Sequence, residues 1–208
     1  MFLKICGITR LDDAKLAIDA GATALGFVVW PKSPRFVSTR KVAEIVETLP
    51  PSVVTVGVFV NESPEGIALT MRRTGLTMVQ LHGDEPATYA SALAWPILRS
   101  VTLDTANEIL GVWPADTTLL MDAADLERRG GTGRSGDWMT ARDLARRRRL
   151  VLAGGLTPAN VAEAIVSVNP YGVDVSSGVE DAPGVKNPQK VARFLSAARA
   201  AMRRLRCN

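Results

Sequence analysis

Short apolar runs alternate with longer amphipathic stretches along the sequence, and this alternation strongly limits the folds that the chain can adopt. Strands are expected at the apolar runs, which are Phe2–Ile5, Ala24–Val29, Val53–Val60, Met78–Leu81, Ile97–Val101, Thr117–Met121, Leu150–Ala153 and Gly172–Val175. Helices are expected between them, at Leu11–Ala20, Thr39–Leu49, Pro64–Thr74, Pro86–Ala94, Ala106–Val112, Trp138–Arg147, Pro158–Val168 and Pro188–Leu205. Strands that alternate regularly with helices indicate an α/β fold with a parallel sheet.

Four of the expected helices have clear start signals, since a proline falls in the first turn. The pairs are Ser63-Pro64, Glu85-Pro86, Thr157-Pro158 and Asn187-Pro188. Proline suits this position because the backbone N–H that it lacks would have no partner inside the helix. Three of the preceding side chains, Ser63, Thr157 and Asn187, are also suitable N-caps.

The sheet can be open and doubly wound, or closed into a barrel. An open dinucleotide-binding sheet usually carries a G-x-G-x-x-G turn after its first strand, whereas this chain has Cys6-Gly7-Ile8-Thr9 there. Eight units in 208 residues average about 26 residues each, which suits a compact (β/α)8 barrel. No linker or change of composition marks a second domain. The prediction is therefore one single-domain TIM barrel over residues 1–208.

Composition and charge argue against several classes of function. The formal net charge is only +4, and the arginine clusters, such as 146–149, are not interleaved with stacking aromatic residues. We therefore expect no nucleic-acid partner. Lys4 and Asp12 interrupt any N-terminal apolar region, and no apolar run reaches membrane-spanning length, so we expect a cytoplasmic protein without a membrane partner.

Cysteine and histidine usage limits the redox and metal chemistry. The two cysteines, Cys6 and Cys207, lie near opposite ends of the chain, and a structural disulfide is not expected. His82 is the only histidine, and no cluster of cysteine and histidine has the spacing of metal ligands. The sequence therefore predicts no metal and no cofactor.

In a barrel of this kind the active site lies at the carboxyl ends of the strands, which turns the fold prediction into a list of residues. Cys6 follows the first expected strand, Arg35 lies in the loop after the second, and His82 follows the fourth. Asp122 follows the sixth strand, and Asp174 lies near the end of the eighth. These five residues are the candidates for catalysis and substrate binding.

Glycine-rich loops at consecutive strand ends predict an anion site. Barrels often bind phosphate with the loops after strands seven and eight, and glycine lets backbone N–H groups approach an anion closely. The candidate residues are Gly154 and Gly155 after the seventh strand, Ser176, Ser177 and Gly178 after the eighth, and Gly131 and Gly133 beyond the sixth. Tight turns without a ligand are the competing interpretation.

Acid–base chemistry is the reaction type that the remaining groups favour. A partly desolvated Asp122 can serve as a general acid, and a thiolate at Cys6 can serve as a base, which together suit an isomerisation. Arg35 lies in a loop stiffened by Pro31 and Pro34, and its guanidinium suits a carboxylate. The alternatives are a buried structural cysteine, a solvated loop aspartate, a surface arginine and a histidine that is only a polar wall.

Several segments together resemble the phosphoribosylanthranilate isomerase family of tryptophan biosynthesis. In order they are Lys4-Ile5-Cys6-Gly7-Ile8-Thr9, Gly26-Phe27-Val28, Ser33-Pro34-Arg35, Val56-Gly57-Val58-Phe59, Val79-Gln80-Leu81-His82-Gly83, Gly130-Gly131-Thr132-Gly133, Leu152-Ala153-Gly154-Gly155-Leu156, Gly172 to Glu180, and Pro183-Gly184-Val185-Lys186. Each segment is weak alone, but their order and spacing are specific and cover nearly the whole chain.

The resemblance implies a substrate and a role for each group. It implies an Amadori rearrangement of N-(5-phosphoribosyl)anthranilate to 1-(2-carboxyphenylamino)-1-deoxyribulose 5-phosphate. Asp122 would protonate the ribose ring oxygen, and Cys6 would remove the proton from C2. Arg35 would hold the anthranilate carboxylate, the glycine loops would bind the phosphate, and Asp174 would face the substrate.

Two departures from the family pattern are visible, and other functions stay open. Gly136 stands where the family usually has Phe, and Asn187 stands where Asp is usual. The alternatives are another phosphosugar isomerase or epimerase barrel and an inactive barrel that serves as an interaction protein. The expected partners are a small phosphosugar and, in assembly, either no second chain or a homodimer.

Overall fold

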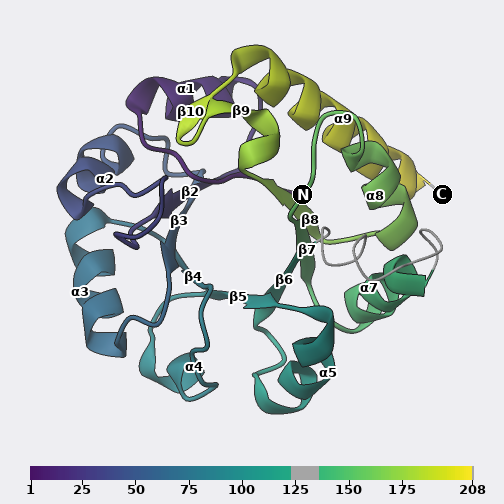
Figure 1. Ribbon diagram of the computed structural model, residues 1–208, viewed down its shortest axis with the longest axis horizontal. Coiled ribbons are helices and arrows are strands. Elements are labelled where there is room, and N and C mark those ends of the chain that lie inside the picture. Colours follow the sequence, from purple (N-terminus) through teal and green to yellow (C-terminus); the bar gives the residue numbers. More distant parts are fainter. Residues whose placement is uncertain (123–135, 208) are drawn as a thin grey trace.

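The computed structural model describes residues 1–122 and 136–207, and within these ranges the side chains of 103, 104, 107, 122, 136–138, 206 and 207 are outside the description. The described chain forms a closed parallel barrel, with its strands hydrogen-bonded in sequence order and β8 paired back to β1. Helices surround the barrel (Figure 1). This confirms the predicted (β/α)8 TIM barrel.

The barrel strands follow the predicted apolar runs closely. They are β1 Phe2–Ile5, β2 Ala24–Val28, β3 Val54–Phe59, β4 Met78–Leu81, β5 Ile97–Val101, β6 Thr118–Asp122, β7 Leu150–Ala153 and β8 Gly172–Val175. The sixth strand begins and ends one residue later than predicted, so Asp122 is its last residue rather than the residue that follows it.

The helices agree with the predictions in order but not always in extent. They are α1 Leu11–Asp19, α2 Thr39–Val46, α3 Pro64–Thr74, α4 Tyr89–Ala92, α5 Leu103–Val112, α7 Gly136–Arg147, α8 Val161–Val168 and α9 Pro188–Cys207. The predictions Pro86–Ala94 and Pro158–Val168 were wrong at their starts. Residues 87–88 and 158–160 form turns instead, and the side chain of Asn160 accepts a hydrogen bond from the backbone N–H of Thr157.

Capping by side chains explains where several helices begin. Ser63 accepts a hydrogen bond from the N–H of Gly66 at the start of α3, and Asn187 accepts one from the N–H of Lys190 at the start of α9. Thr102 and Thr105 cap one another's backbone N–H at the start of α5. This explains why α5 starts before Ala106, the predicted first residue.

Alternation along the strands separates two cores. Seven residues from six strands, two of them from β7, form a cluster that fills the barrel interior: Phe2, Ala24, Val56, Leu98, Leu120, Val151 and Ala153. A larger cluster, which includes Leu3 and Ile5, lies between the barrel and the helices. Lys4 and Cys6 have the same strand parity as Phe2, and so they belong to the interior layers above it.

A short segment after β8 has no counterpart in the predictions. It comprises a 3-10 turn, η1 Ser177–Val179, and an antiparallel hairpin of β9 Glu180–Ala182 and β10 Val185–Lys186. The hairpin lies beside α1 and the start of α9 (Figure 1). It brings charged side chains to the carboxyl end of the barrel. No helix in the described ranges is long and apolar enough to cross a membrane.

Candidate active site

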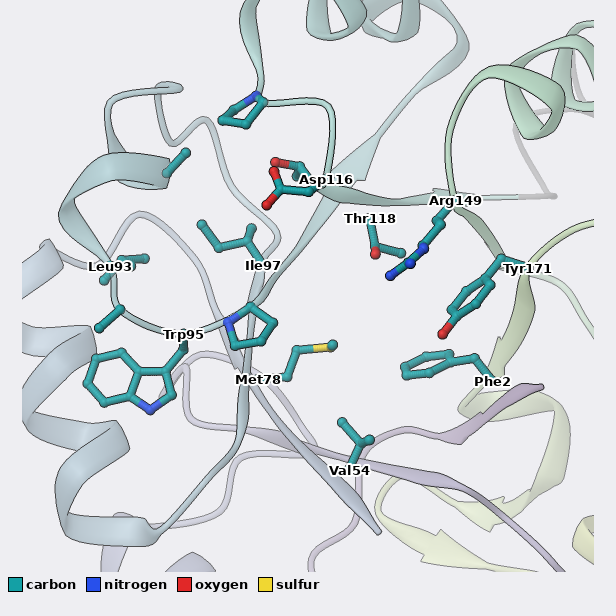
Figure 2. Close-up of a pocket in the computed structure, with 15 residues that line it drawn as sticks. Phe2, Val54, Met78, Leu93, Trp95, Ile97, Asp116, Thr118, Arg149 and Tyr171 are labelled. Carbon is teal, nitrogen blue, oxygen red and sulfur yellow. The ribbon is translucent and has the colours of Figure 1, made fainter. Parts of the chain in front are cut away.

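Two cavities of about 520 Å³ each lie at opposite ends of the barrel. The one at the amino ends of the strands is walled by Phe2, Val54, Met78 and Tyr171, with Asp116 and Arg149 at its edge (Figure 2). The other, at the carboxyl ends, is lined by nine of the twelve predicted site residues: Cys6, Arg35, His82, Gly154, Gly155, Asp174, Ser176, Ser177 and Gly178. The chemistry is therefore concentrated at the carboxyl end.

Cys6 lies directly after β1, and a backbone hydrogen bond to β8 holds its position. Its N–H donates to the carbonyl of Val175 over 2.8 Å, which continues the pairing between β1 and β8. Gly7 has a left-handed φ of 75°, which glycine adopts without strain. A Cβ atom on Gly7 would lie 2.6 Å from Cδ of Arg35 and 2.9 Å from Oγ of Ser176. The glycine thus lets these two side chains approach the end of β1.

Lys4 is a charged residue of the site that the sequence analysis did not single out. Its side chain is fully buried, and its Nζ donates to Oδ2 of Asp174 over 2.9 Å. Burial alone would lower the pKa of Lys4, but the carboxylate of Asp174 and the sulfur of Cys6 together outweigh it and raise that pKa. The sequence feature that could have identified Lys4 is its place as a single lysine in an otherwise apolar strand. A charge inside a barrel needs a partner, and such a partner is often part of a site.

Glu180 of β9, a second residue that was not predicted as part of the site, orients the side chain of Arg35. Its Nε donates to both carboxylate oxygens of Glu180, and its Nη2 donates to Oε2 over 2.6 Å. Lys186 of β10 donates to the same carboxylate over 2.7 Å and also to the backbone carbonyls of Cys6 and Ser176. The hairpin therefore joins the arginine to the end of β1.

The electrostatics of this cluster follow from its burial. Burial alone would raise the pKa of Glu180, but hydrogen bonds from Arg35 and Lys186 outweigh it and lower that pKa. Burial lowers the pKa of Lys186, although Glu180 opposes the shift. No local pattern in the sequence predicts this cluster, because Arg35 and Glu180 are 145 residues apart.

On the opposite wall, Glu85 shapes the loop that carries His82. In the sequence Glu85 marks only an expected helix start, but its carboxylate is buried and accepts hydrogen bonds from the N–H groups of Asn61 and Gly83. Arg99 of β5 donates to it over 2.7 Å. His82 itself interacts with Gln80, whose Nε2 lies 3.1 Å from the His82 Nδ1. These contacts fix the ends of β3 and β4 around the cavity.

The two glycine loops of the predicted anion site pack against each other. Gly154 and Gly155 have left-handed φ values of 66° and 61°. A Cβ atom on Gly178 would lie only 1.9 Å from the carbonyl oxygen of Leu156, so no larger residue fits there without movement. The side chain of Asn160 donates to the carbonyl of Gly155 over 3.0 Å and braces the first loop.

Three buried polar atoms of residues that line the cavity have no hydrogen-bond partner among the described residues. They are Oε1 of Gln80, Oδ1 of Asp174 and Oγ of Ser176. Buried polar atoms are normally satisfied, so such atoms at a cavity are suited to a ligand's polar groups.

Asp122, Gly131 and Gly133 complete the predicted site, but only part of this set can be placed. Asp122 ends β6, where its backbone pairs with Ala153 of β7, and its side chain is outside the description. Gly131 and Gly133 lie outside the described residues. The backbone thus brings Asp122 to the same end of the barrel as Cys6.

A closed parallel barrel with this polar cavity at the carboxyl ends of its strands defines a (β/α)8-barrel enzyme. Comparison with known proteins then gives the family. A family model described as N-(5'phosphoribosyl)anthranilate (PRA) isomerase matches residues 3–197, and the chain belongs to this family. It is accordingly an isomerase of the tryptophan pathway, as its resemblance to the family implied.

Individual relatives agree over nearly the full chain. N-(5'-phosphoribosyl)anthranilate isomerase of Trichlorobacter lovleyi is 46% identical over 204 residues, which are 96% of this chain and 98% of that protein. A solved phosphoribosylanthranilate isomerase in complex with reduced 1-(o-carboxyphenylamino)-1-deoxyribulose 5-phosphate is 38% identical, with a TM-score of 0.85 and coverage of 96% and 99%. Monomers generated from the dimeric Thermotoga maritima isomerase are 36% identical, with a TM-score of 0.84 and the same coverage.

Proposed function

We propose that the cavity at the carboxyl end catalyses the Amadori rearrangement of N-(5-phosphoribosyl)anthranilate to 1-(2-carboxyphenylamino)-1-deoxyribulose 5-phosphate. The observation that carries the proposal is that a thiol, a guanidinium, an unpaired carboxylate oxygen and two glycine loops line one cavity of about 520 Å³. The substrate carries a phosphate, a sugar and a carboxylate, and each has a matching group.

The phosphate would lie between the loops after β7 and β8. Gly154 and Gly155 supply a backbone that can approach an anion closely, and Ser176, Ser177 and Gly178 form the facing loop. The Oγ of Ser176, which has no partner among the described residues, is available as a donor. Gly131 and Gly133 are proposed as a third wall.

The anthranilate carboxylate would bind Arg35. The bonds of this guanidinium to Glu180 use Nε and Nη2, which leaves Nη1 to face the substrate. A guanidinium held in this way loses little side-chain freedom on binding, which favours affinity. His82 would form part of the wall beside the aromatic ring.

The reaction itself needs an acid and a base. Asp122 would donate a proton to the ribose ring oxygen as the bond from C1 to that oxygen breaks, and the nitrogen lone pair would form the Schiff base. The thiolate of Cys6 would then take the proton from C2, and the electron pair of that bond would neutralise the Schiff base to an enolamine. Tautomerisation moves one proton from the 2-hydroxyl to C1, and transfer of one proton from the thiol to the carboxylate restores both groups.

Asp174 would orient the sugar during these steps. Its Oδ2 is engaged by Lys4, while its buried Oδ1 has no partner among the described residues and lies at the cavity. A substrate hydroxyl that donates to Oδ1 would satisfy it. This hydrogen bond would hold the C2 proton in a constant position relative to Cys6.

The test is a fluorescence assay that follows the loss of freshly generated phosphoribosylanthranilate. Cys6→Ser and Asp122→Asn are each expected to lower kcat at least about 100-fold, the typical scale of acid–base catalysis, while binding of a reduced product analogue is retained. Cys207→Ser and Asp116→Asn are matched controls, remote in sequence or in the fold, and should keep full activity. Near-normal turnover of either active-site variant would show that its role is wrong.

Neither a metal nor a cofactor has a part in this scheme. In the described residues, no group of three or more His, Cys, Asp and Glu side chains could hold a metal ion. We expect turnover to be unchanged by excess EDTA, and its loss, with recovery on addition of a divalent cation, would contradict the scheme.

The remaining sequence predictions concern organisation and location. We propose that residues 1–208 act as one barrel domain in the cytoplasm, either as a monomer or as a homodimer like the dimeric Thermotoga maritima relative. Sedimentation velocity over a range of protein concentrations distinguishes these two states.

A further inference from the structure

Lys4 lies at a position where burying a charged side chain is energetically unfavourable. Its side chain is fully buried inside the barrel, and its neighbours across the strands are Ala24 of β2 and Asp174 of β8. Removing an ammonium from water is energetically unfavourable, and a good partner is needed to offset that cost. The ion pair with Asp174 offsets the cost of burial but gives no reason for a charge here, since an apolar pair could fill the same space.

The same ammonium also lies against the proposed base. Lys4 precedes Cys6 by two residues, so both side chains point to the barrel interior. A Cβ atom on Gly26 of β2 would lie 2.7 Å from Sγ of Cys6 and 3.0 Å from Nζ of Lys4. Sulfur and nitrogen therefore flank one point, and the ammonium lies close enough to the thiol to act on it electrostatically. Gly26 leaves the space in which this contact forms.

The thiol needs such a neighbour if it is to act as a base. Cys6 is buried, and burial raises the pKa of its thiol, which disfavours the thiolate. The ammonium of Lys4 opposes this shift, and the carboxylate of Asp174 reinforces it. With the ammonium in place the pKa of the thiol is still raised, and removing that charge would raise it further.

The other cations near Cys6 are placed differently. Lys186 bonds the backbone carbonyl of Cys6, and Arg35 lies beyond Gly7, and both donate to the carboxylate of Glu180. Lys4 is likewise paired with Asp174, so position rather than charge balance distinguishes it. Among the described side chains, Lys4 is the cation whose charged atom lies beside the same point of Gly26 as the sulfur.

We propose that Lys4 is a positioning residue for the isomerisation: its ammonium holds the sulfur of Cys6 beside the cavity and supplies the positive charge next to which the thiolate forms. The inference rests on the proposed role of Cys6 as the base. The proposal also gives the two partners of this ion pair different roles. Asp174 offers Oδ1 to the substrate, while the ammonium bound to Oδ2 turns toward Cys6.

The test measures the thiol directly, in a Cys207→Ser background where Cys6 is the only cysteine. The rate of alkylation by iodoacetamide is followed against pH for the parent protein and for Lys4→Met. We expect the titration of Cys6 to move up by at least about one pH unit, which means at least about tenfold slower alkylation at neutral pH. The acid limb of the pH profile of kcat/KM should move in the same direction.

A matched control and a second variant keep the result decisive. Lys15→Met replaces an exposed lysine of α1 and should leave both titrations unchanged. Lys4→Gln removes the charge but keeps a donor for Asp174, and it is used if Lys4→Met does not fold, as judged by thermal unfolding. An unchanged thiol titration in a folded Lys4 variant would overturn the proposal, even if activity fell, because a purely structural role predicts that pattern.

The outcome is separable from that of the proposed function. A shifted titration together with an active Cys6→Ser variant would support the charge effect of Lys4 on the sulfur but refute its part in catalysis. A shifted titration together with an inactive Cys6→Ser variant would support both.

Discussion

Replacing Glu180 by Gln tests whether the hairpin cluster is a buried ion pair that stabilises the fold. The side chains of Glu180 and Lys186 are 4% and 0% exposed, and they lie 2.7 Å apart. In Glu180→Gln the amide oxygen can still accept a hydrogen bond, but the ammonium of Lys186 is left in the interior without its counter-charge. Removing one partner of a buried pair typically costs about 3–5 kcal/mol.

The expected loss is near the lower end of that range, about 3 kcal/mol, because Lys186 keeps two backbone carbonyls as acceptors. For a chain of this length, about 2–4 °C is lost per kcal/mol, so the Tm should fall by about 6–12 °C. Urea unfolding followed by circular dichroism gives the free energy of unfolding, and an unchanged m-value would show that the unfolded state is the same.

The matched control is Glu44→Gln on α2. Glu44 pairs with Lys41 over 3.2 Å, but both side chains are half exposed, and a pair of this kind contributes at most about 1 kcal/mol. If Glu180→Gln lost no more stability than Glu44→Gln, the argument that burial makes the hairpin cluster important would be refuted. The same variant should also raise KM, because Arg35 loses the carboxylate that orients it.

Two further predictions concern pH and the phosphate loop. The pKa of Glu180 is lower in the folded protein than its ordinary value of 4.5. Its stabilising effect is therefore complete above the ordinary value and is lost as the pH falls below it and through the lower pKa of the folded protein. Urea midpoints between pH 6 and pH 3 should fall less steeply for Glu180→Gln than for the parent protein. Gly178→Ala should raise KM for the phosphorylated substrate at least about tenfold, because its Cβ would lie 1.9 Å from the carbonyl oxygen of Leu156 and force the two loops apart. The control is Gly111→Ala, where a Cβ meets nothing within 4 Å, and this variant should leave KM unchanged. Steady-state kinetics measures both glycine variants, and an unaltered KM in Gly178→Ala would show that the phosphate does not depend on the spacing of these loops.

Much of the site could be predicted from strand ends alone. Cys6, Arg35, His82 and Asp174 come from different strands or loops, and the structure brings all four into one cavity. The reason is topological. In a parallel barrel every carboxyl strand end lies at the same rim, so a residue that follows an apolar run is placed there before any contact is known.

The starts of the helices were less predictable where capping competed with proline. Pro64 and Pro188 do begin helices, because Ser63 and Asn187 cap them. Pro158 does not, since the side chain of Asn160 bonds the N–H of Thr157 and holds a turn ahead of α8. The same Asn160 side chain also donates to the carbonyl of Gly155. The later start of α8 thus depends on contacts that exist only in the folded loop.

The sequence by itself determined the barrel, the order of its strands and the rim at which the polar residues gather, because hydrophobic periodicity and strand ends are local properties of the chain. Only the tertiary structure decided how those residues are held. Lys4 and Asp174 are 170 residues apart, and Lys186 bonds the carbonyl of Cys6 from 180 residues away. Buried charges pair with residues that become their neighbours only when the barrel closes, and no local sequence pattern predicts those pairs.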